Sequence, residues 1–326
     1  MSTHDRPSGP DNGSERTLRE LFAHAAPRPA PPDADAEEIR RAVYAEWDAI
    51  TGRRVFWRRA GGAVAAAAVV GAVALFVLDT GKGPLPIVAT VERVQGNVEV
   101  DGVPLRIGAA LEQDARLATH SGRVSLRLVD GGSLRLAAQT ELTLLAGTEA
   151  KLDAGKLYFD SNGSAAASKF AVRTGFGTLR DVGTQFIAEL DSTRLDIGVR
   201  DGRVALLRGT ENVAADAGER VTVPRGSGSV RRQPIDRFGA DWAWAEQLAQ
   251  PFEIDGRQLI DFLDWVARET GRTLVFADAD VERAVRETVL SGSMELDPLR
   301  KLAAVMALTD FDYTIDGGRI IVRARQ

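Results

Sequence analysis

The stretch "RVSLRLVDGGSLRLAA", residues 123–138, decides the fold of the chain's middle region. Apolar residues alternate with polar ones, as in a strand with one buried face, at Val124, Leu126 and Leu128. Residues 130–132 then supply a turn, and the alternation resumes at Leu134 and Leu136. The stretch therefore predicts a β-hairpin.

The same period of two extends outward from this hairpin, from Val88 to about Val223. Asp101-Gly102 predicts a tight turn, and "RLDIGVRDGRVALL" predicts a second hairpin that turns at Asp201-Gly202. Gly183 and Gly202 are expected where a strand bends or turns, at positions that favour a positive φ. No helix-length pattern intervenes, so we expect an all-β sandwich or a solenoid-like sheet.

Several motifs of this region follow one another in an order that resembles the FecR family. They are "VQGNVEV", "LATHSGRVSLRLVDGGSLRL", "LDAGKLYFD", "FAVRTGFGTLRDVGTQFIAEL", "VRDGRVALL" and "AGERVTV". The resemblance implies a regulator of an extracytoplasmic-function sigma factor, in which a membrane span precedes this domain. It also implies that signalling proceeds through stepwise cleavage by site-specific proteases.

The C-terminal region has a mixed pattern. A helix is expected in "DRFGADWAWAEQLAQ", a short strand at residues 252–254, and a helix in "GRQLIDFLDWVARETG" that Gly271 ends. "TLVFA" predicts a strand, and the next helix begins with Asp297 as N-cap and Pro298 at its first position. "FDYTIDGGRIIVRA" predicts a closing hairpin.

This C-terminal pattern resembles the short N-terminal domain of secretins and TonB-dependent transporters, the STN domain. The resemblance rests on "IDFLDWVARETGRTLVF" and "DPLRKLAAVMALTDFDYTIDGGRIIV". It implies a periplasmic signalling or docking module, and contact with a TonB-dependent outer-membrane transporter.

Residues 60–78 carry no charged or polar side chain. As a helix they would be about 28 Å long, close to the ~30 Å thickness of a bilayer's hydrocarbon core, so a transmembrane helix is expected. A buried core helix and a cleaved signal peptide are the alternatives; about fifty residues precede the charged flank, which disfavours the signal peptide. The expected membrane-interface residues are Arg53, Arg54, Phe56, Trp57, Arg58 and Arg59. The four arginines predict that the N-terminus lies in the cytoplasm. With the FecR resemblance, this implies a bacterial inner-membrane protein with a periplasmic C-terminus.

The first 59 residues contain two short amphipathic patterns between proline-rich stretches. Their stripes could pack weakly on each other, lie on the membrane surface, or dock on a cytoplasmic partner. With the FecR resemblance, that partner would be the sigma factor, and the expected contact residues are Leu21, Phe22, Ile39, Val43 and Trp47. Ten arginines balance ten acidic residues here, so direct nucleic-acid binding is not expected.

Composition and motifs exclude several chemistries. The chain has no cysteine, which removes disulfides, thiolate metal sites and cysteine nucleophiles. It lacks a complete phosphate-binding loop and an H-E-x-x-H motif. His120 is expected to be a surface residue, and acidic residues such as Asp160 and Asp196 look scattered along strand edges. We therefore expect no enzyme, cofactor or metal.

Taken together, the sequence predicts an α+β membrane protein in five parts. These are a sigma-interacting tail (1–59), a single transmembrane helix (60–78), a periplasmic FecR domain (85–225), a linker with a helix (226–250) and an STN-like domain (251–326). The expected function is an inner-membrane regulator that relays a periplasmic signal to transcription. The alternative is an envelope structural or glycan-binding protein with a passive cytoplasmic tail.

Overall fold

The computed structural model describes residues 85–164 and 167–325. A large sheet holds β1 (Ile87–Gln95), β2 (Glu99–Val100), β3 (Val103–Pro104), β4 (Ala110–Glu112), β5 (Arg116–Ala118), β6 (Arg123–Leu128), β7 (Ser133–Leu136), β8 (Glu141–Ala146), β9 (Glu149–Asp160), β10 (Ala171–Thr174), β11 (Gly177–Leu190), β12 (Arg194–Arg208), β13 (Glu211–Asp216), β14 (Glu219–Pro224) and β15 (Arg231–Pro234), with a 3₁₀ turn η2 (Ala167–Lys169). The C-terminal elements are α4 (Ala240–Glu246), α5 (Leu259–Thr270), β16 (Thr273–Phe276), α6 (Ala279–Glu287), α7 (Pro298–Ala307), β17 (Phe311–Asp316) and β18 (Arg319–Ala324).

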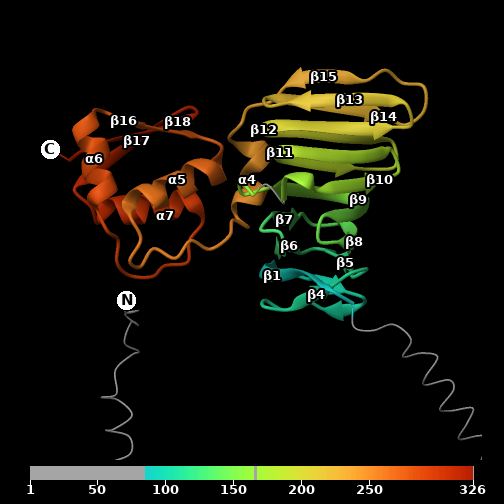
Figure 1. Ribbon diagram of the computed structural model, residues 1–326, viewed down its shortest axis with the longest axis horizontal. Helices are drawn as coiled ribbons and strands as arrows, with labels where there is room; N and C mark the ends of the chain where they lie inside the picture. Colours follow the sequence, from blue (N-terminus) through green and yellow to red (C-terminus); the bar gives the residue numbers. More distant parts are fainter. Residues whose placement is uncertain (1–84, 165–166, 326) are drawn as a thin grey trace, which may run out of the picture. The chain divides into compact units, whose positions relative to one another are not determined.

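The strands of the large sheet stack from β4 at one end to β15 at the other (Figure 1). The hairpin predicted for residues 123–138 is confirmed, since β6 and β7 pair with Val124 opposite Leu136. The turn at Asp101-Gly102 is also confirmed, because β2 and β3 pair across it. Both turn residues have positive φ, 50° and 79°, as such hairpins require.

The second predicted hairpin, with its turn at Asp201-Gly202, is wrong. Residues 194–208 form one strand, β12, which pairs with β11 on both sides of this point. The pairing shifts register there instead of reversing direction. The expectation of a positive φ at Gly183 and Gly202 is confirmed, with values of 71° and 74°. An Asp-Gly pair suits a bulge as well as a turn, and here it bends the strand.

The large sheet folds into two halves, and its three longest strands, β9, β11 and β12, run through both of them. The C-terminal part of β9 pairs with β7, whereas its N-terminal part pairs with β8 and β10. Between the two parts lies Gly155, with φ 94°, where a Cβ would approach the Gln139 carbonyl oxygen to 2.5 Å. The chain can bend this sharply, and pass this close to its neighbour, only without a side chain.

One hydrophobic core fills the space between the two halves of this sheet. It combines residues of the β6–β7 hairpin, such as Leu134, with residues of the other half, such as Leu142 and Leu206. Phe159 lies at its centre, stacked on Phe170 with a ring separation of 4.4 Å. We call residues 85–234 the β-domain.

The C-terminal module, residues 251–325, has its own core and its own sheet. The strand order is β16-β18-β17, with β16 and β18 parallel. The α5 helix is confirmed together with its end at Gly271, which adopts the left-handed conformation. The Asp297 cap before Pro298 and the β17–β18 hairpin are also confirmed. The strand expected at residues 252–254 is wrong, because that segment has no ladder partner.

The α+β membrane fold class expected from the sequence is contradicted. Strands hold 47% of the described residues and helices 17%, which makes the protein mostly β. Within residues 85–164 and 167–325 no helix is long and apolar enough to cross a membrane. The physical reason is that most backbone hydrogen bonds of this part are made in sheet ladders, while its longest helix, α5, has 12 residues. The apolar run at 60–78 lies outside the described residues.

Candidate functional site

All residues expected to contact a sigma factor or the membrane interface lie outside the described residues. These are Leu21, Phe22, Ile39, Val43, Trp47, Arg53, Arg54, Phe56, Trp57, Arg58 and Arg59. Their roles stay predictions.

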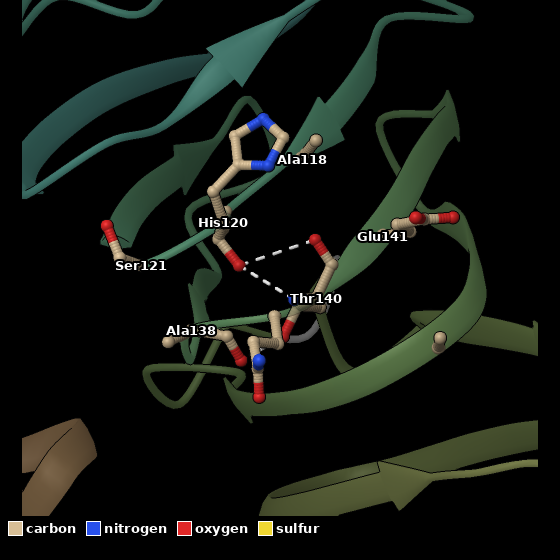
Figure 2. Close-up of a pocket in the computed structure, with 9 residues that line it drawn as sticks. Ala118, His120, Ser121, Ala138, Thr140 and Glu141 are labelled. Carbon is tan, nitrogen blue, oxygen red and sulfur yellow. Dashed lines mark hydrogen bonds between the residues drawn. The ribbon is translucent and has the colours of Figure 1, made fainter.

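A hollow of about 530 Å³ lies beside β5 and β8 (Figure 2). Thr119 is one of its lining residues: its hydroxyl donates to the Ala137 carbonyl oxygen at 2.5 Å and accepts from the Thr140 amide at 2.8 Å. His120 lies at its edge, half exposed, with Nε2 3.2 Å from the Glu99 carboxylate. Figure 2 shows the His120 ring and the Glu141 carboxylate well apart. The hollow therefore does not bring His120 and Glu141 together, and His120 pairs with Glu99 at its edge.

Metal ligands are not brought together either. In the part of the chain that the structure describes, no three His, Asp or Glu side chains are grouped in a way that could hold a metal ion. The titratable groups that do gather lie elsewhere, on the outer face of the β-domain.

That outer face is formed by the alternate residues of four adjacent strands, whose other faces point into the core. In β7 these residues are Ser133 and Arg135, and in β9 they are Tyr158 and Asp160. All four are fully buried. Gln185 and Arg200 continue the face on β11 and β12 and are also buried. A polar face of a sheet is normally solvated, so something must cover it.

The cover is made of α4 and the C-terminal end of α5. A small apolar cluster joins α4 to the sheet, where Trp242 packs on Tyr158 with an edge-to-face ring contact at 6.3 Å. The Trp242 indole donates to the Asp236 carbonyl oxygen at 2.7 Å. The end of α5 brings Arg268 and Glu269 onto the same face. We call the residues that meet here the ionic interface: Arg135, Asp160, Gln185, Arg200, Glu246, Arg268 and Glu269.

Arg135 is the centre of the ionic interface. Its Nη2 and Nη1 atoms each lie 2.8 Å from a carboxylate oxygen of Glu269, and its Nη1 also donates to the Ala245 carbonyl oxygen at 2.8 Å. Its guanidinium lies 4.9 Å from the centre of the Tyr158 ring. One side chain thus binds α4, α5 and the sheet, through the fork geometry that only arginine provides.

Arg200 makes a second bridge of the same kind. Its Nη1 donates to the Glu269 carbonyl oxygen at 2.8 Å and its Nη2 to the Glu246 carboxylate at 2.8 Å. The guanidinium also lies 4.5 Å from the Trp242 ring centre, a favourable cation–π distance. This arginine therefore connects α4 with the last residues of α5.

The third contact reverses the polarity, because the sheet supplies the acid. The Asp160 carboxylate accepts from Arg268 Nη2, and from Gln185 Nε2 at 2.7 Å. The Gln185 amide also reaches the Arg268 carbonyl oxygen at 3.3 Å. Asp160, expected among acidic residues scattered on strand edges, is the last residue of β9, and its carboxylate is fully buried in a cluster of charges.

The electrostatics of the ionic interface are dominated by burial. Burial raises the pKa of the Glu246 carboxyl despite the neighbouring Arg200 guanidinium. Burial also raises the pKa of the Tyr158 hydroxyl, with a further contribution from the Asp160 carboxylate. For Arg135 burial, the largest single influence, acts to lower the pKa, but Glu269, Tyr158 and Asp160 together outweigh it, so the pKa is raised and the guanidinium stays charged.

Sequence reasoning missed the ionic interface. A local signal exists, because arginine at position 135 stands between two core leucines in a short strand. That pattern indicates a solvent-facing residue, however, and nothing near it indicates a helix 134 positions further on. The contacts of the ionic interface give it a structural role: it holds the C-terminal module on the β-domain.

Comparison with known proteins finds a family match within the β-domain. Residues 115–205, which span β5 to most of β12, match the family described as FecR protein. Two crystal structures of a candidate anti-sigma factor from Parabacteroides distasonis, at 2.50 and 1.65 Å resolution, are similar at 17% and 18% identity. They cover 64% of this chain and 97% and 98% of their own, each with a TM-score of 0.33. No curated protein matches. The chain thus contains a FecR-type region inside its β-domain.

Proposed function

We propose that this protein regulates an extracytoplasmic-function sigma factor. The observation that carries the proposal is the FecR match of residues 115–205. The described residues suit a signalling protein of two docked modules, because the buried charges of the β-domain hold a second module in place. The role is regulatory and not catalytic.

The sigma factor would be bound by the apolar stripe Ile39, Val43 and Trp47 of the N-terminal tail. The test is a two-hybrid assay of the full chain against each extracytoplasmic-function sigma factor of the source bacterium. Val43→Asp and Trp47→Asp should abolish one interaction. Ala45→Asp, which lies off the stripe, should preserve it. If no such sigma factor binds the wild-type chain, the proposal fails.

We further propose that the tail lies in the cytoplasm and the β-domain in the periplasm of the bacterial inner membrane. The support is the arginine cluster at residues 53–59, which would stay on the cytoplasmic side. An alkaline phosphatase fusion after residue 85 should be active, and one after residue 50 inactive. The reverse pattern would overturn this arrangement while leaving the sigma-factor assay unaffected.

The C-terminal module would act as the STN-like receiver of the signal, from a TonB-dependent outer-membrane transporter, with site-specific proteases completing the relay. The support is its compact fold, a three-stranded sheet packed with α5, α6 and α7. Deleting residues 251–326 should abolish induction of a sigma-dependent reporter without loss of sigma-factor binding. Unchanged induction would argue against this part, and glycan binding with no sigma factor would favour an envelope structural role.

A further inference from the structure

The β-domain and the C-terminal module each have a complete hydrophobic core. One core contains Leu134, Phe159 and Val199 of the β-domain, and the other contains Phe262 and Leu302 of the module. Neither core borrows residues from the other. The ionic interface lies between them, whereas the small apolar cluster around Trp242 joins α4 to the sheet and contains no residue of the module. The module's attachment to the sheet is therefore made chiefly by charges.

An interface built from paired charges behaves differently from an apolar one. Separating apolar faces exposes them to water at a cost that grows with their area. Separating ion pairs returns each group to hydration, and this recovers the desolvation energy that burial had cost. The faces that separate here would carry Arg135, Asp160 and Arg200 on one side and Arg268 and Glu269 on the other. Both faces carry charged side chains that water can hydrate once they separate.

The two helices of the cover differ in how they are attached. The α4 helix adds apolar contacts, through Trp242 and Ala245, to its ionic ones. The end of α5, residues 268–271, attaches through Arg268, through both the side chain and the carbonyl of Glu269, and through the close fit of Gly271. We call residues 268–271 the latch.

Gly271 shows how tightly the latch is seated. With φ 64°, it ends α5 against the segment that follows β15. A Cβ at this position would lie 1.9 Å from the Arg237 carbonyl oxygen and 2.8 Å from Arg200 Nε. Arg237 is itself bound to the β-domain through Asp201 at 2.8 Å. Only glycine allows this approach, so residue 271 controls the docking distance.

From these contacts we infer that the latch is a reversible closure: the end of α5 docks on and leaves the Arg135–Asp160–Arg200 face while both cores remain folded. The latch does not depend on the proposed role in regulating a sigma factor. If that role holds, the docked and released states are the two states between which a periplasmic signal chooses. Release needs no unfolding of either module.

The absence of cysteine from the chain provides a direct test. Ser133→Cys places a single thiol on the covered face, where the side chain is fully buried beside Arg135 and Asp160. Thr270→Cys places one on the latch itself, also fully buried. Ala188→Cys places one in the core of the β-domain and reports global unfolding. Each full-length variant is treated with a maleimide under native conditions and its labelling rate is measured.

If the latch opens reversibly, the thiols at 133 and 270 should be labelled at a common rate, at least about tenfold faster than the thiol at 188. Adding Gly271→Ala should raise labelling at 133 about tenfold or more, because the clash opens the closure. Labelling at 188 should not change. Gly256→Ala is the matched control, since that glycine has φ 71° but nothing within 4 Å of an added Cβ.

Two results would overturn the inference. One is equal labelling at 133, 270 and 188, which would mean that the two modules open only as one unit. The other is a Gly271→Ala effect no larger than that of Gly256→Ala. If Gly271→Ala unfolds the β-domain, the thiol at 188 will reveal it, and the comparison is then made with Arg268→Gln, which removes one latch contact and adds no atom to the interface.

Discussion

Replacing Arg135 with methionine should be among the most damaging single changes on the outer face of the β-domain. The substitution keeps much of the side chain's apolar volume but leaves the Glu269 carboxylate buried without its cation. It also removes the donor to the Ala245 carbonyl oxygen. Breaking one partner of a buried pair costs about 3–5 kcal/mol. In a domain of this size that loss lowers the melting temperature by about 6–20 °C.

The double variant Arg135→Met with Glu269→Leu separates the charge effect from the packing effect. Without the carboxylate, the unpaired charge disappears. The Ala245 carbonyl oxygen loses the Arg135 donor but keeps the Leu248 amide at 3.0 Å, so the remaining cost is about 1 kcal/mol. The double variant should therefore be more stable than Arg135→Met alone. Arg173→Met is the control: its pair with Glu149 has similar distances, 2.6 and 2.8 Å, but is exposed, and should cost at most about 1 kcal/mol.

The assay is equilibrium denaturation of the full chain, followed by tryptophan fluorescence. Two of the chain's five tryptophans, Trp242 and Trp244, lie on α4 beside the ionic interface, so part of the emission reports its state. If Arg135→Met costs no more than Arg173→Met, then water reaches Glu269 in solution, and the reasoning about a desolvated interface is refuted.

Two further predictions rest on other features. Gly155→Ala should destabilise the β-domain by about 3 kcal/mol or more, because φ is 94° and the new Cβ would lie 2.5 Å from the Gln139 oxygen. Gly209→Ala is the control, since Gly209 has φ 57° and nothing within 4 Å of an added Cβ, and it should cost only about 1 kcal/mol. Both variants are measured by equilibrium denaturation in urea, and equal losses of stability would contradict the argument that the bend at Gly155 excludes a side chain. The raised pKa of Glu246 sets a pH dependence with a definite sign. Its folded state holds a proton more tightly than its unfolded state, so its contribution is present below pH 4.5 and is lost as pH rises through the folded pKa. Between pH 4 and 7 the wild type should lose stability relative to Glu246→Gln as pH rises. If the denaturation midpoints of the two proteins instead change in parallel with pH, the raised pKa of Glu246 is disproved.

Local patterns in the sequence predicted local structure well. The 123–138 hairpin and the α5 helix with its Gly271 end were predicted from periodicity and turn chemistry, which act over a few residues. The Asp201-Gly202 hairpin was wrong because the same dipeptide serves turns and bulges, and the choice depends on the partner strand. Gly183, on that partner strand, also has a positive φ, and the two strands bend together.

The ionic interface could not be predicted in the same way. Arg135 and Glu269 are 134 positions apart, and each taken alone has the pattern of a solvated charge. Only the packing of the module on the sheet makes them partners. The mostly β character was underestimated for a related reason: the C-terminal helices looked prominent in the sequence, yet the longest of them has 12 residues, while β12 alone has 15.

The position of β1 has a mechanical consequence. This strand is the first of the described chain, yet it does not lie at an edge: it pairs with β4 on one side and β6 on the other. A pull transmitted from the preceding residues would load two hydrogen-bond ladders at once, instead of peeling one strand from a margin. Tension arriving from that direction is thus resisted by the interior of the β-domain, and in a force-spectroscopy trace this domain should rupture in one high-force event, distinct from that of the C-terminal module.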